Sequence, residues 1–313
     1  MTAAQPRPSR GEQLVVPPAE FASYYGQPVI KAPVWRVPDV PGYLFLGGLA
    51  GASSALAAGA QLAGHGELAR SAKTTAAGAI GLSAVALVHD LGRPSRFLNM
   101  LRVFKPTSPM SVGSWLLAAY GPAAGVAAAS AVTGRLPAVG RASTAVAALL
   151  GPGVASYTAA LLSDTAVPAW HEAHRELPYL FVSSAATAAG GLGLVTVRSE
   201  QAGPARNLAL VGAAAELTAK SMLLQRLGQV AEPYQSGRAG RLMEAAEILT
   251  ASGLTAVAIG GRNRLVAAVA GAALLASSAL TRFGIFYAGR TSAHDPEYTV
   301  GPQRDRIKRR TGR

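Results

Sequence analysis

Of the chain's 313 residues, 50% are hydrophobic and only 14% are charged, well below the share of about 25% in soluble domains. This composition argues against a soluble protein and indicates a membrane protein, and the lack of cysteine excludes both a disulfide bond and a thiolate-bound iron-sulfur cluster in the chain. The net charge of +13 is typical of basic loops that meet anionic lipid, whereas the basic tail lacks the interleaved aromatic residues or module of nucleic-acid binding.

The first segment, residues 1–37, is polar and Pro-rich, without the apolar core of a secretory signal peptide. Eight apolar runs follow, each of roughly the 18 or more residues that can cross a bilayer. We therefore predict an all-α integral membrane protein with eight transmembrane helices in two four-helix bundles. The predicted spans are residues 40–63, 71–88, 110–132, 142–162, 177–197, 205–227, 242–259 and 265–286.

The same pattern predicts how the chain is organised. The predicted parts are an extramembrane segment (1–37), a first bundle (38–163) with an interfacial connection (89–110), a loop (164–176), a second bundle (177–286) and a basic tail (287–313). Basic residues concentrate in the loops on the side of the two termini. The positive-inside rule therefore predicts that both termini lie on the cytoplasmic side of the cell membrane.

Three chemically versatile side chains, His89, Asp90 and Arg93, follow the second predicted span directly. Asp and Arg at a membrane boundary commonly form a structural ion pair. Alternatively, His89 and Asp90 exchange protons while Arg93 holds a ligand oxygen, because burial and neighbouring charges tune such groups. Residues 96–105, which alternate basic with apolar side chains, predict an interfacial amphipathic helix that either lies on the membrane or roofs a cavity for a lipid-soluble ligand.

The fourth span ends with Tyr157 and Asp164, which are seven residues apart and therefore share a helix face. One interpretation is structural: the Tyr157 hydroxyl binds a neighbouring helix and Asp164 caps the span. The other is that a phenol donor and a carboxylate that can transfer protons line one polar cleft.

Charged side chains also interrupt two later spans. Glu216 and Lys220 are one turn apart, a spacing that suits an internal ion pair and otherwise a proton path or transport site. Glu244 and Glu247 raise the same question as further proton-transfer candidates. None of the five histidines lies at the centre of a span, which disfavours haem, and we predict no metal site.

Several short motifs resemble those of the NrfD/PsrC family, the quinone-reactive integral membrane subunits of polysulfide-reductase-like molybdenum oxidoreductases. They are Asp90-Leu-Gly-Arg-Pro94, Ser108-Pro-Met-Ser-Val-Gly113, Tyr157-Thr-Ala-Ala-Leu-Leu162, Val167-Pro-Ala-Trp170 and Leu177-Pro-Tyr-Leu-Phe181. The chain has Ala159 where a glycine is common in the family.

The resemblance implies a subunit of a respiratory complex that binds menaquinone or ubiquinone near one membrane face, with no haem or cluster of its own. Electrons would pass between the quinone pool and an iron-sulfur partner, which connects to a catalytic subunit of the molybdopterin or hydrogenase type. Tyr157 matches the family tyrosine proposed to hydrogen-bond the quinone, and His89, Asp90 and Arg93 join it by position and chemistry. We also expect the subunit to transfer protons.

Two other functions remain open from the sequence. One is a secondary transporter that uses Glu216 and Lys220, against which stands the lack of clear inverted repeats. The other is a passive anchor for a redox partner that never touches quinone.

Overall fold

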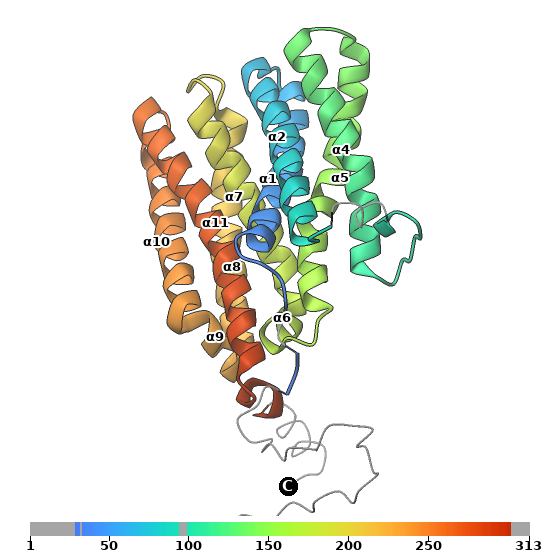
Figure 1. The fold of residues 1–313 in the computed structure, drawn as a ribbon. Helices are drawn as coiled ribbons and strands as arrows, with labels where there is room; N and C mark the ends of the chain where they lie inside the picture. The colour runs from blue at the N-terminus through green and yellow to red at the C-terminus, as the bar shows by residue number, and fades with distance from the viewer. Residues whose placement is uncertain (1–28, 32, 94–98, 302–313) are drawn as a thin grey trace, which may run out of the picture.

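The computed structural model describes residues 29–31, 33–93 and 99–301, and this part folds into long helices that run alongside one another (Figure 1). The long helices of the first half are α1 (Asp39–Leu62), α2 (Gly66–Asp90), α4 (Pro109–Thr133) and α5 (Pro137–Ser163). Those of the second half are α7 (Leu177–Thr196), α8 (Gly203–Leu227), α10 (Gly237–Gly260) and α11 (Arg264–His294). Short helices join them: α6 (Pro168–Glu172) and η1 (Ala173–Arg175) before α7, and η2 (Gly228–Ala231) and α9 (Glu232–Gln235) before α10.

Within the described residues, seven helices are long and apolar enough to cross a membrane, namely all of the long helices except α8. The prediction of a helical membrane protein is therefore confirmed. The sixth predicted span, residues 205–227, is a helix as expected, but it carries Arg206, Glu216, Lys220 and Arg226. Placing charged side chains in a bilayer costs free energy. The length and composition of α8 therefore do not confirm it as an eighth span.

The central helices of the fold are α1 and α7. The first contacts α2, α5 and α7, and the second contacts α8 and α11 as well as α1. Figure 1 shows α4 and α5 at one edge of the molecule and α10 and α11 at the other. One apolar core includes Leu49 of α1, Ala188 of α7 and Phe286 of α11. The two halves thus share a core, and the arrangement in two separate four-helix bundles is not confirmed.

Facing glycines let the central helices approach their partners closely. A Cβ atom at Gly51 of α1 would lie 2.3 Å from the carbonyl oxygen of Gly151 on α5. The pair Gly191 and Gly271 repeats this arrangement between α7 and α11, where the corresponding distance is 2.6 Å. Small residues at such contacts are how membrane helices gain van der Waals packing.

We expect Gly51→Ala to destabilise the protein by about 1–3 kcal/mol, because the new methyl group must push α1 and α5 apart. Gly59→Ala on the same helix is the control, since a Cβ there meets nothing within 4 Å. Thermal unfolding in detergent measures both variants. Equal melting temperatures for the two would show that the close approach of α1 and α5 contributes nothing.

The motifs that carry the family resemblance gather at one end of the helices, which we call the motif end. There α2 ends at Asp90, α4 begins at Pro109 and α5 ends at Ser163. The short helix α6 and the start of α7 lie at the same end (Figure 1). The opposite end, where α1 joins α2 and α10 joins α11, we call the far end.

Candidate functional site

A partly enclosed cavity of about 120 Å³ lies at the motif end, between α1, α2, α4 and α5. Most of its lining is apolar, including Trp35, Leu44, Leu87, Met100, Met110 and Leu161. The polar groups on its wall belong to Tyr43, Asp90, Ser114 and Tyr157. An apolar cavity with a few convergent polar groups is the usual form of a small-molecule site.

Tyr157 supplies the most distinctive polar group of this cavity. Its ring packs edge-on against Tyr43, with 6.4 Å between the centroids, and lies against the backbone of Gly113. The hydroxyl is buried and has no hydrogen-bond partner among the described residues. A buried polar group without a partner costs about 1–3 kcal/mol, so its presence on a cavity wall points to a ligand. The structural interpretation, in which Tyr157 binds a neighbouring helix, finds no support here.

Gly113 makes room for the ring of Tyr157. A Cβ atom at Gly113 would lie 2.2 Å from Cε2 of Tyr157, so no larger residue fits without moving the ring. Gly113 ends the motif that begins at Ser108, and this contact gives a physical reason for a glycine at that position. The motifs of α4 and α5 therefore meet at the cavity wall.

Asp90 and His89 do not contact each other in the way that the proton-exchange hypothesis expects. Oδ1 of Asp90 accepts a hydrogen bond from the backbone nitrogen of Arg36 at 3.0 Å, and Asp90 lines the cavity. His89 points elsewhere: its Nδ1 lies 2.8 Å from Oδ2 of Asp39, and its side chain is 68% exposed. Adjacent residues of a helix do not face each other, so a direct pair was the wrong expectation. Arg93 lies beyond α2, is exposed, and does not line the cavity.

The start of α4 holds the preceding segment against the helix. Ser108 caps α4 by accepting a hydrogen bond from the backbone nitrogen of Ser111, whose hydroxyl donates to the Val103 carbonyl oxygen at 3.0 Å. A second, open pocket of about 250 Å³ lies here, and it shares Met100, Met110 and Ser114 with the cavity. These shared residues make the second pocket a natural mouth for the first.

The predicted amphipathic helix at residues 96–105 lies partly outside the described residues, which resume at Asn99. Within the described part, only Asn99 and Met100 are helical. Val103 and Phe104 are exposed, as side chains at a membrane interface would be.

Asp164 does not share a cleft with Tyr157. It lies one residue beyond the end of α5, where the backbone leaves the helix, and it is exposed. Its backbone nitrogen donates to the Ala160 carbonyl oxygen at 2.9 Å, so Asp164 is the C-cap of α5, as the structural interpretation expects. Leu161 and Leu162 line the cavity instead.

Trp170 packs behind the wall of the cavity, against its lining residue Trp35. It is fully buried, its ring stacks on that of Trp35 with 5.5 Å between the centroids, and Trp35 lines the cavity. The indole nitrogen of Trp170 donates to the Ile285 carbonyl oxygen at 2.8 Å, which fixes the ring against α11. Trp35 and Tyr43 were not predicted as site residues, although their position beside the first span was visible in the sequence.

In the second half, the predicted ion pair between Glu216 and Lys220 is wrong. Nζ of Lys220 lies 2.6 Å from Oε2 of Glu247 on α10, whereas Oε1 of Glu216 accepts a hydrogen bond from Thr281 on α11 at 3.0 Å. Helix α8 thus presents these residues to different neighbours, which spacing along one helix cannot reveal. Glu244 is exposed on α10.

Comparison with known proteins places this geometry in a family. The model of the family described as polysulphide reductase, NrfD, matches residues 28–291. The chain belongs to the NrfD family. No curated protein matches the chain significantly. The matched range includes all the long helices of this NrfD chain up to Thr291 in α11, together with its five motifs.

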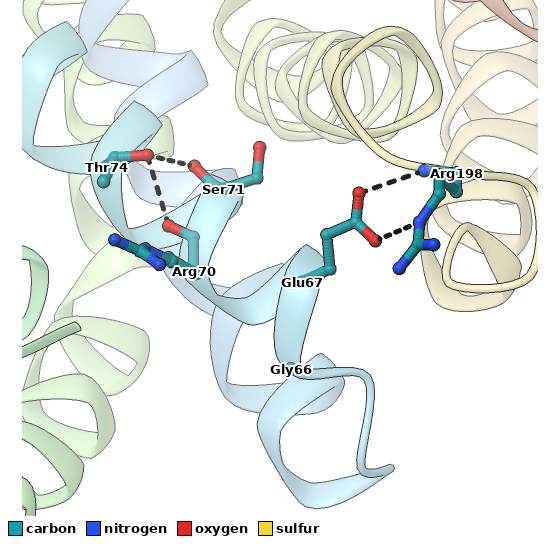
Figure 2. Close-up of a pocket in the computed structure, with 6 residues that line it drawn as sticks. All are labelled: Gly66, Glu67, Arg70, Ser71, Thr74 and Arg198. Carbon is teal, nitrogen blue, oxygen red and sulfur yellow. Dashed lines mark hydrogen bonds and ion pairs between the residues drawn. The ribbon is translucent and has the colours of Figure 1, made fainter. Parts of the chain in front are cut away.

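The NrfD chain has another hollow, at the far end, which is open and measures about 610 Å³. Figure 2 shows Glu67 accepting hydrogen bonds from the side chain of Arg198 at 3.1 Å and from its backbone nitrogen at 3.3 Å. The Thr74 hydroxyl bonds back to its own helix. These groups already have protein partners and none belongs to the shared motifs, so this hollow is the weaker candidate despite its size.

Proposed function

We propose that the chain is the quinone-binding membrane subunit of an oxidoreductase complex and that the cavity beside Tyr157 receives the quinone head group. Membership of the NrfD family indicates a membrane subunit of a quinone-linked redox complex. The observation that carries the proposal is the buried, partnerless Tyr157 hydroxyl on the wall of an apolar cavity at one helix end. Quinone carbonyl oxygens are hydrogen-bond acceptors, which matches this donor.

The size of the cavity agrees with the proposal. Its volume of about 120 Å³ is close to the roughly 150 Å³ of an engineered apolar cavity that admits benzene. A single quinone ring is therefore a close fit. A two-ring head group would need movement of Met100 and Met110, whose flexible side chains separate the cavity from its mouth.

The polar side chains have separate roles in this proposal. Quinone reduction takes up protons as well as electrons, so a site needs donors at the carbonyl oxygens and titratable groups leading to water. Tyr157 donates a hydrogen bond to one carbonyl oxygen of the quinone, and Asp90 on the cavity wall exchanges protons with titratable groups at the rim of the cavity. At the rim, the exposed His89 and its partner Asp39 connect the site to water.

Electrons must come from or go to a partner, because the chain has no cysteine with which to hold an iron-sulfur cluster. We propose an iron-sulfur protein docked at the motif end, close to the cavity, which connects to a catalytic oxidoreductase subunit. This arrangement keeps the distance between the cluster and the quinone short.

We further propose that α8 crosses the membrane as the eighth span. Its 25 residues contact α7 and α10, which precede and follow it in the chain and are both candidate spans. Its charged Glu216 and Lys220 are buried inside the protein, which lowers the cost of placing them at membrane depth.

Purification of the tagged protein in mild detergent tests the proposed function. We expect an iron-sulfur protein in stoichiometric amount together with extractable quinone. The same partner without quinone would instead favour a passive anchor, and a lone protein with neither would favour a transporter.

We expect a reporter fused after Arg313 to be active in the cytoplasm, because basic loops face that side. A fusion of the same reporter after Gly64, in the far-end turn between α1 and α2, should be active outside. The reverse result would place the motif end, and with it the redox partner, on the outer face of the cell membrane.

A further inference from the structure

A second group of buried polar atoms lies in the other half of the protein, between α7, α8 and α11. Glu216 is 3% exposed and Arg282 is 1% exposed. Oε2 of Glu216 and both Nε and Nη1 of Arg282 have no hydrogen-bond partner among the described residues. Neither residue lines the cavity beside Tyr157.

Both side chains are nevertheless held firmly by their other atoms. Oε1 of Glu216 accepts from the Thr281 hydroxyl at 3.0 Å. Nη2 of Arg282 donates to the Phe181 carbonyl oxygen at 2.7 Å, and its guanidinium lies 3.8 Å above the centroid of the Phe181 ring. The unpartnered atoms are therefore free ends of side chains that are already fixed in place.

The two charged groups interact without forming a direct ion pair. Their charges lie close enough to influence each other, yet no nitrogen of Arg282 comes within 4.0 Å of a Glu216 oxygen in the described structure. Unpaired buried donors and acceptors that lie close together usually bind ordered water. A bound cation is disfavoured by the guanidinium, and a bound anion is disfavoured by the carboxylate.

We propose that this group is a buried proton-binding site in which Glu216 carries the proton and Arg282 is its fixed counter-charge. A hydrated proton gives its proton to Oε2 of Glu216 and leaves a water molecule, and the reverse step returns the proton to water. The proposal does not depend on quinone binding, because it uses other residues and another test.

A short series of charged side chains begins beside this site on the same helix. Lys220 lies one turn from Glu216 on α8 but faces α10, where its Nζ binds Glu247. The Lys220 side chain is 11% exposed and that of Glu247 is 56% exposed, so the series ends at the protein surface. The groups that face Glu216 are Ser184 and Thr187 of α7 and Thr281 and Arg282 of α11.

Infrared difference spectroscopy of the purified full chain during a pH titration tests this site directly, because a protonated carboxyl group has its own C=O stretching band. We expect a titrating band that moves in heavy water and is lost in Glu216→Gln. Glu244→Gln, at an exposed position on α10, should leave it unchanged. A band that persists in Glu216→Gln would overturn the proposal, and so would the absence of any such band in the wild type.

A second variant decides the matter if Glu216→Gln does not fold. Thr281→Val removes the hydroxyl that donates to Oε1 of Glu216, so the carboxyl band should shift in frequency without being lost. An unmoved band would assign the signal to another carboxyl group and overturn the proposal. Quinone content, measured on the same samples, reports separately on the cavity beside Tyr157.

Discussion

Replacement of Tyr157 by Phe is expected to lower quinone-dependent turnover by roughly 10²-fold or more, the usual cost of losing a donor to a developing oxyanion. The variant keeps the ring that packs against Tyr43 and Gly113 and removes only the partnerless hydroxyl. Its melting temperature should therefore stay the same or rise, since a buried unsatisfied group is lost. Turnover with a soluble quinone analogue and thermal unfolding measure the two effects.

Tyr120→Phe is the matched control. Tyr120 is also fully buried, but its hydroxyl donates to the Ala50 carbonyl oxygen at 2.6 Å and contacts the Ser54 hydroxyl at 2.7 Å. Its removal should lower stability by about 1–3 kcal/mol and leave quinone turnover intact. Unchanged turnover in Tyr157→Phe would remove Tyr157 from the site.

Gly113→Ala is expected to abolish quinone binding and to destabilise the protein by about 1–3 kcal/mol. The new Cβ atom would lie 2.2 Å from Cε2 of Tyr157, so the ring must move, and it can do so only by entering the cavity or disturbing Tyr43. Quinone extracted from the purified protein and its melting temperature check the two effects.

Gly121→Ala on the same helix controls for the loss of a glycine. A Cβ at Gly121 meets nothing within 4 Å, so this change should be neutral or stabilising by up to about 1 kcal/mol, with normal quinone content. Normal quinone content in Gly113→Ala would contradict the tight contact between α4 and the ring of Tyr157.

The helices of the fold were largely predictable because membrane spans are long and apolar. The first predicted span, residues 40–63, differs from α1 by one residue at each end. Two features were not predictable from local composition. Helix α8 buries Glu216 and Lys220 in contacts with its neighbouring helices. The facing glycines join α1 to α5 and α7 to α11, and a sequence pattern does not pair these residues.

The candidate site was predictable where a motif carried it. Tyr157 and Asp90 both line the cavity, as a shared site requires. Their partners were not predictable, because they come from distant segments: Tyr43 beside Tyr157, Asp39 beside His89 and Glu247 beside Lys220. Helical spacing describes one helix, whereas each of these contacts joins different helices.

The most direct test of the central claim is labelling of the purified protein with a photoreactive quinone, followed by mass spectrometry of its peptides. We predict labels on the cavity wall, in the segments that contain Ser114 of α4 and Leu161 of α5, and loss of these labels in Gly113→Ala. An open apolar groove between α10 and α11, lined by Gly253, Ala256 and Val269, is the natural competitor. Labels confined to that groove would contradict a quinone site beside Tyr157.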